Sequence, residues 1–150
     1  MPLNIRSATV DDLYAAVALL QGRDLPTDGF ADLLRAQPQH VLVAELNGAV
    51  VGSAALDVHG SVALLRSVAV AKDLATLGVG TRLVSDLMTL ARAERLTSVF
   101  LLTTTADQWF PKFGFTATDR ASVPASLATT VEFTSACPAS AVVMRCDLAH

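Results

Sequence analysis

The spacing of apolar residues near the start of the chain predicts a short strand followed by two helices. The strand covers residues 3–6. A first helix is expected at 13–22, where Leu and Val recur every three to four residues until Gly22. A second, shorter helix is expected at 28–36, and Pro38 ends it.

A β-hairpin is the clearest local signal in the sequence. Residues 40–46 and 49–57 are rich in Val, Leu and Ala, and they flank Asn47-Gly48. This dipeptide tolerates the positive φ angles that both central residues of a type I′ turn require. A third strand is expected at 61–70, after a turn at His59-Gly60, so the pattern predicts a three-stranded antiparallel meander.

The second half of the chain changes to alternating helices and strands. Residues 78–94 have the pattern of an amphipathic helix, and the apolar run 99–103 is typical of a strand buried on both faces. The other expected elements are a short helix at 106–113 closed by Gly114, a strand at 115–118, a helix after Pro124 in the otherwise ambiguous segment 120–138, and a last strand at 141–148. A meander followed by a crossover helix predicts an α/β fold. Its sheet would be mixed and mostly antiparallel, with six to seven strands and helices on both faces.

Composition excludes several classes of function. The 150 residues are 52% hydrophobic, 17% charged and 5% aromatic, with a net charge of −3. The high apolar fraction excludes a disordered chain, and an acidic chain with few aromatic residues gives no basis for nucleic-acid binding. The stretches free of charge are shorter than the roughly 20 residues that a membrane-spanning helix needs. We therefore expect one domain over residues 1–150, with no nucleic-acid partner and no membrane segment.

Residues near both ends of the chain indicate the cellular compartment of the protein. Arg6, Asp11 and Asp12 stand where a signal peptide would have its apolar region. Cys137 and Cys146 are too few for a disulfide scaffold. They either pair with each other or remain buried free thiols, and we expect free thiols. These features predict a cytoplasmic protein, and no metal site is predicted.

Two glycines at the start of the long helix form the strongest chemical signal. In Gly78-Val79-Gly80-Thr81 the glycines let the backbone approach an anion, and the first N–H groups of a helix have no partner inside it. The pattern is typical of a pyrophosphate site and also of an ordinary turn. Leu83 stands where a dinucleotide-binding G-x-G-x-x-G motif needs its third glycine, so that motif is absent.

Over nearly its whole length the chain resembles the GNAT acetyltransferase superfamily. The resemblance is carried by Leu-Leu-Arg-Ser-Val-Ala-Val at 64–70, the loop 75–80, the helix 81–94 and the Phe-x-x-x-Gly-Phe element at 110–115. Within GNATs the chain is most similar to arsenic-resistance acetyltransferases and N-acetylglutamate synthase-like domains. The residues behind this narrower resemblance are 65–70, 101–106, Arg120, Val123, Pro124, Thr130, Glu132, Phe133, Cys137, Pro138, Ser140, Ala141 and Met144.

The resemblance implies acetyl-CoA as cosubstrate. It implies that the backbone of Val68 and Val70 pairs with the pantetheine arm, and that the amides of Gly78, Val79, Gly80 and Thr81 hold the pyrophosphate. The loop departs from the family pattern, because Ala75 stands where Arg or Gln is usual and Leu77 where a basic residue is frequent. Lys72 and Arg82 lie nearby in the sequence and are candidates to replace the missing charge.

The resemblance also directs attention to the residues that handle the substrate. Phe110 occupies the position where many GNATs have a tyrosine that acts as an acid, so no dedicated acid is expected. Glu132 is the candidate general base, or else a surface or ion-paired carboxylate. Arg66 interrupts an apolar strand, where it either grips a substrate carboxylate or pairs with Glu45, Asp57 or another acid. Arg120 is a second candidate clamp, and Ser67 adds a hydroxyl group.

Together these residues predict transfer of an acetyl group to the α-amino group of an amino-acid-like small molecule. The reaction is expected to proceed by direct transfer in a ternary complex. The resemblance implies glutamate-like acceptors, including organoarsenical analogues. The alternative is a catalytically idle GNAT domain that senses a metabolite or acyl-CoA, or that binds a partner. A homodimer is also expected, through pairing of the tail strand between two subunits.

Overall fold

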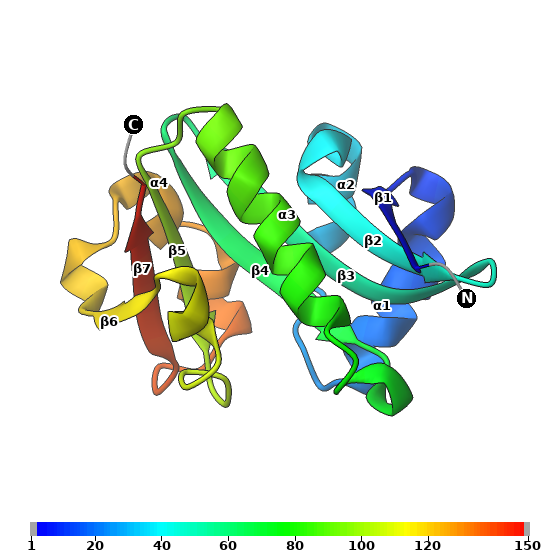
Figure 1. Cartoon of the computed structure of the whole chain (residues 1–150). Coiled ribbons are helices and arrows are strands. Elements are labelled where there is room, and N and C mark those ends of the chain that lie inside the picture. The colour runs from blue at the N-terminus through cyan, green and yellow to red at the C-terminus, as the bar shows by residue number, and fades with distance from the viewer. Residues whose placement is uncertain (1–2, 149–150) are drawn as a thin grey trace.

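The computed structural model describes residues 3–148 and is built around one seven-stranded sheet (Figure 1). The strands are β1 Leu3–Ser7, β2 Val41–Leu46, β3 Ala49–His59, β4 Val62–Val70, β5 Ser98–Thr103, β6 Thr116–Thr118 and β7 Val142–Asp147. Their order across the sheet is β1-β2-β3-β4-β5-β7-β6. Neighbouring strands are antiparallel except β4 and β5, which are parallel. The predicted mixed, mostly antiparallel sheet is confirmed.

Helices cover both faces of the sheet. The α-helices are α1 Leu13–Gly22, α2 Phe30–Ala36, α3 Val79–Ala93 and α4 Ala125–Ala128. Leu20 of α1 and Phe30 of α2 pack with Val43, whereas Leu83 of α3 packs with Ala44. Because successive residues of a strand point to opposite faces, α3 lies across the sheet from α1 and α2. No helix within residues 3–148 is long and apolar enough to cross a bilayer.

The predicted hairpin is confirmed. Asn47 and Gly48 have φ angles of 55° and 80°, as a type I′ turn requires. The third strand of the meander also pairs as predicted, although β3 extends to His59, two residues further than expected. The turn is shifted because Gly60, with φ 64°, adopts the left-handed conformation that reverses the chain.

The predictions for the segment after β5 were only partly right. The expected helix at 106–113 is reduced to a single 3₁₀ turn, η4 Phe110–Phe113, in which Pro111 has no N–H to continue helical bonding. The expected helix after Pro124 is present as α4. It is followed by a π-helical turn, η6 Glu132–Ala136, that the sequence did not indicate.

The tail strand β7 lies inside the sheet rather than at its edge. It pairs with β5 along Val142–Asp147 and with β6 on its other side. Both of its backbone edges are therefore engaged within one chain over Val143–Arg145, which leaves only the ends of this strand for the predicted pairing between subunits. The homodimer itself stays a prediction.

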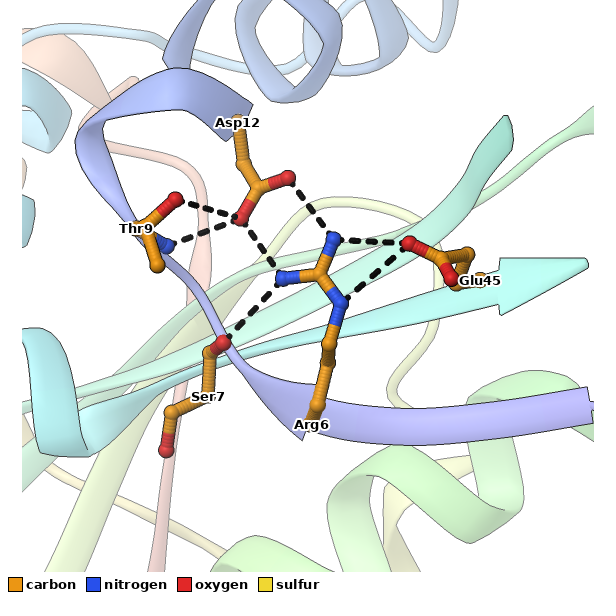
Figure 2. Close-up of polar contacts among 5 residues, drawn as sticks. All are labelled: Arg6, Ser7, Thr9, Asp12 and Glu45. Carbon is orange, nitrogen blue, oxygen red and sulfur yellow. Dashed lines mark hydrogen bonds and ion pairs between the residues drawn. The ribbon is translucent and has the colours of Figure 1, made fainter. Parts of the chain in front are cut away.

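An ionic network fixes the start of the chain to the sheet (Figure 2). Arg6 of β1 donates to both carboxylate oxygens of Asp12, at 2.8 and 2.9 Å, and to Oε2 of Glu45 on β2, at 2.9 Å. Asp12 in turn accepts the backbone N–H of Thr9 at 2.8 Å, which caps the turn before α1. The Arg6 guanidinium holds the pKa of Asp12 below its ordinary value.

Candidate active site

A cleft opens where β4 and β5 separate. The two strands pair only over Val62, Ala63 and Leu64, and both continue beyond this point without pairing with each other. The cleft has a volume of ≈ 890 Å³. It is lined by the ends of both strands, the loop before α3, the first turn of α3, η4 and part of the tail.

A β-bulge lies in β4 at the cleft. The register between β3 and β4 shifts between Ser53 and Ala55, so that Ser67 and Val68 together lie opposite one residue of β3. Ser67 adopts φ 59°, an unusual value for a residue other than glycine. The hydroxyl of Ser53 donates a hydrogen bond of 2.8 Å to the carbonyl oxygen of Ser67, which stabilises the bulge.

The edge of β4 that faces β5 borders the cleft with its backbone. Beyond Leu64 this edge has no strand partner in the described sheet. Val68 and Val70 lie on this segment, and both line the cleft. An extended ligand can therefore pair with the strand there as a neighbouring strand would.

The two glycines lie where the cleft meets the start of α3. Gly78 precedes the helix with φ 80°, which favours glycine, and no atom lies within 4 Å of where its Cβ would be. A Cβ on Gly80 would lie 3.4 Å from Cγ2 of Val70 and 3.5 Å from Cζ2 of Trp109, so a side chain would fill the approach to the helix. The free N–H groups of the first turn fit a phosphate-bearing ligand.

Arg66 is buried at the floor of the cleft, and two of its three guanidinium nitrogens have polar partners. Its Nε donates to Oγ of Ser67 at 3.1 Å, and its Nη2 donates to the backbone carbonyl of Asp28 at 2.7 Å. The same Nη2 forms an ion pair of 3.0 Å with Oε1 of Glu132. The acid that pairs with Arg66 is therefore Glu132, whereas Glu45 pairs with Arg6.

Glu132 is buried, and its two oxygens have different surroundings. Oε2 accepts a hydrogen bond of 3.2 Å from the thiol of Cys137. Oε1 has the ion pair with Arg66, but within residues 3–148 no donor is aligned to make a hydrogen bond to it. Burial, together with the negative charge of Glu132, raises the pKa of Cys137 to about 12. The thiol is therefore a neutral donor rather than a nucleophile at neutral pH.

Arg120 does not line the cleft. Its Nη2 donates to the carbonyl oxygens of Pro138 and Ala139, at 3.2 and 3.4 Å, and its guanidinium lies 5.7 Å from the ring centre of Phe133. These contacts fasten the segment that follows Cys137. The predicted second clamp on the substrate is thus engaged in holding the tail.

The aromatic residues near the cleft carry no hydroxyl group. Phe110 is buried and packs edge-to-face on Trp109, with ring centres 4.9 Å apart. Tyr14, the one tyrosine of the chain, is 88% exposed on α1 and is not among the described residues that line the cleft. The expectation that the reaction uses no dedicated acid stays a prediction.

The sequence did not indicate the contacts that three residues of the cleft make in the structure. The carbonyl of Asp28 binds Arg66, Trp109 covers the start of α3, and Lys112 reaches Thr81. Lys112 had a detectable signal, since it is the one cation within the Phe-x-x-x-Gly-Phe element. Residues 3–148 contain no cluster of metal-binding side chains.

Comparison with solved structures supports the description of the fold. The chain superposes on N-acetylglutamate synthase from Neisseria gonorrhoeae, complexed with coenzyme A and N-acetyl-glutamate, with a TM-score of 0.84 and 20% identity, over 100% of this chain and 36% of that one. It superposes on Rv2747 from Mycobacterium tuberculosis, solved in complex with CoA, with a TM-score of 0.81 and 26% identity, over 97% and 99% of the two chains.

Comparison of sequences identifies the family. The chain is 34% identical over 118 residues to an amino-acid acetyltransferase from Ralstonia nicotianae, a match that covers 74% of this chain and 26% of the relative. The chain thus spans about a quarter of that relative's length. The sequence profile of the Acetyltransferase (GNAT) family matches residues 8–115, which hold the meander, the glycine loop, α3 and the Phe-x-x-x-Gly-Phe element. This protein belongs to the GNAT family of acetyltransferases.

Proposed function

We propose that this protein transfers the acetyl group of acetyl-CoA to the α-amino group of an amino-acid-like molecule, with glutamate-like compounds as the preferred class. The observation that carries this proposal is the buried ion pair between Arg66 and Glu132 at the floor of the cleft, with Oε1 of Glu132 lacking a hydrogen-bond donor. A buried acceptor without a donor costs about 1–3 kcal/mol. An incoming ammonium group supplies that donor.

The charges of an amino acid match those of the ion pair. When its ammonium group donates to Oε1 of Glu132, the negative charge of Glu132 is shared with the ligand. Arg66 is then left with excess positive charge, and the carboxylate of the same ligand balances it. A simple amine satisfies Glu132 but leaves Arg66 uncompensated at a buried position, which is costly.

Glu132 is also the candidate general base. An ammonium group has no lone pair, so it must lose a proton before it attacks an acyl carbon. Acetyl-CoA supplies an acyl group on a thiol whose pKa is like that of free Cys, about 8.5, so the thiolate leaves without an acid. Glu132 takes the first proton from the ammonium group, the nitrogen–carbon bond forms and the carbon–sulfur bond breaks. The second proton, which the nitrogen loses as the amide forms, passes to the released CoA thiolate or to water. This accords with Phe110 in place of a tyrosine.

The cosubstrate is assigned to the other half of the cleft. The unpaired edge of β4 at Val68 and Val70 suits the amide groups of the pantetheine arm. The amides of Gly78, Val79, Gly80 and Thr81 suit the pyrophosphate. CoA is present in the two related structures described above.

An acceptor panel tests the proposal. Purified protein is incubated with acetyl-CoA and L-amino acids, a glutamate-like organoarsenical and simple alkyl amines, and acetylated products are detected by mass spectrometry. The arsenical stands in the panel as the narrower acceptor that the resemblance to arsenic-resistance acetyltransferases implies. We expect acetylation of glutamate or its analogues and not of alkyl amines. Acetylation of alkyl amines alone would contradict the proposal, and binding of acetyl-CoA with no product from any acceptor would favour a sensor.

A further inference from the structure

We propose that Lys112 binds the pyrophosphate of CoA and supplies the positive charge that the loop before α3 lacks. Residues 75–78 of that loop carry no charge, and Leu77 is 68% exposed. A pyrophosphate held there by backbone amides alone would lack a charge-assisted partner. The inference rests on the proposed use of acetyl-CoA and adds a binding residue to it.

Lys112 reaches the first turn of α3 from a different element. Its Nζ donates to Oγ1 of Thr81 over 3.4 Å, and both residues line the cleft. The backbone N–H of Thr81 is one of the first-turn groups that have no partner inside the helix. An anion bound to these groups therefore lies within reach of the Lys112 ammonium.

Aromatic rings hold the ammonium in this place. Nζ lies 4.7 Å from the ring centre of Trp109 and 5.7 Å from that of Phe113. Cation–π attraction of this kind stabilises an ammonium group beside an aromatic ring. Trp109 also faces Gly80, so the same ring that covers the start of α3 positions the Lys112 charge above it.

The other cations near the loop are less suitable. Lys72 and Arg82 are exposed, and neither is among the described residues that line the cleft. Arg23 lines the cleft, but it belongs to the α1–α2 loop together with Asp28, whose carbonyl binds Arg66. Arg23 is therefore associated with the acceptor end. Lys112 is the described cation that both lines the cleft and contacts the first turn of α3.

Calorimetric titration with three ligands tests the proposal. The ligands are CoA, 3′-dephospho-CoA, which keeps the pyrophosphate, and pantetheine, which has no phosphate. Lys112→Met keeps the aliphatic stem over Trp109, Lys112→Arg keeps the charge, and Lys72→Met is the matched control. Melting temperatures confirm that each variant is folded.

We expect Lys112→Met to weaken the binding of CoA and of 3′-dephospho-CoA equally, by about tenfold at low salt. Lys112→Met should bind pantetheine as tightly as the unaltered protein does. The Lys112→Arg and Lys72→Met variants should keep the CoA affinity of the unaltered protein. Unchanged CoA affinity in Lys112→Met, an equal loss in Lys72→Met, or a loss confined to CoA with its 3′-phosphate would overturn the assignment. Failure of the unaltered protein to bind CoA would overturn the proposed function as well.

Discussion

Nη2 of Arg66 lies 3.0 Å from Oε1 of Glu132, and the two side chains are 4% and 8% exposed. The pair joins the middle of β4 to the turn η6 in the tail. The residue assigned to substrate binding and the residue assigned to proton transfer therefore neutralise each other until a ligand enters. Because the two residues pair with each other, variants of one or both can distinguish their effect on stability from their effect on catalysis.

Removing one member of the pair should destabilise the protein, and replacing both should not. Arg66→Met leaves the Glu132 carboxylate buried without a counter-charge, which costs about 3–5 kcal/mol. The double variant Arg66→Met, Glu132→Leu contains no buried charge at this position, so urea denaturation should give a stability close to that of the unaltered protein. Both variants should acetylate glutamate much more slowly than the unaltered protein. Full activity in the double variant would contradict the account.

Glu132→Gln should separate proton transfer from binding. The amide keeps the shape of the carboxylate but cannot accept a proton from the substrate ammonium at neutral pH. General-base catalysis contributes roughly 10²–10⁴-fold, so kcat should fall by about 100-fold or more while CoA affinity is retained. The residual rate should rise with pH, as the acceptor amine loses its proton to solvent. An unchanged kcat would remove Glu132 from the reaction.

Cys137 should be unreactive toward thiol reagents in the folded protein. Burial raises its pKa to about 12, so very little thiolate exists at pH 8. A folded-state pKa above that of the unfolded chain also means that this group's contribution to stability is complete below the unfolded value and is lost as pH rises toward 12. Labelling with a chromogenic disulfide at pH 8, with and without urea, checks the reactivity. The variant Cys146→Ala isolates Cys137, and rapid labelling of that folded variant would contradict the expectation.

Gly78 and Gly48 form a matched pair for testing the glycine loop. Both have φ 80°, and no atom lies within 4 Å of either missing Cβ, so Ala at each position meets backbone strain but no clash. Each substitution should cost about 1–2 kcal/mol of stability. Only Gly78→Ala should also weaken CoA binding, because Gly48 lies in the distant hairpin turn. Equal CoA affinity in the two variants would argue against a role for the loop.

Asp12 should determine part of the protein's sensitivity to acid. Its pKa is lowered, chiefly by the hydrogen bonds from Arg6. Asp12 therefore contributes to the free energy of unfolding above its ordinary pKa of 3.8, and this contribution is lost as pH falls through the lower folded-state pKa. Asp12→Asn should destabilise the protein by about 1–3 kcal/mol at pH 7. Between pH 5 and pH 3 the variant should also lose less of its free energy of unfolding than the unaltered protein loses, as measured by urea denaturation. The same acid-induced loss in Asp12→Asn and the unaltered protein would show that another group is responsible.

The sequence predicted the elements whose causes are local. Asn47-Gly48 determined the hairpin, the apolar stripe of α3 determined its buried face, and the two glycines marked the start of that helix. The exact ends were less accurate, because they depend on which residue adopts a left-handed conformation, as at Gly60.

The candidate site depends on contacts between distant parts of the chain, which composition and periodicity do not record. The sequence marked Arg66 and Glu132 separately, yet their ion pair requires η6 to fold back against β4. The sequence predicts that Arg120 binds the substrate, but in the structure Arg120 donates to the carbonyl oxygens of Pro138 and Ala139 in the tail. Lys72 and Arg82 are the cations near the glycine loop in the sequence, whereas Lys112 approaches the loop from an element that follows α3 by many residues.

In the proposed complex, the Arg66–Glu132 pair receives the ammonium and the carboxylate of one amino acid. The most direct test compares kcat/KM for acetylation of L-glutamate and of 4-aminobutyrate, which is glutamate without its α-carboxylate. If Arg66 binds that carboxylate, kcat/KM for glutamate should exceed that for 4-aminobutyrate by at least about tenfold, and Arg66→Met should abolish the difference. Equal values for the two acceptors in the unaltered protein would contradict the account.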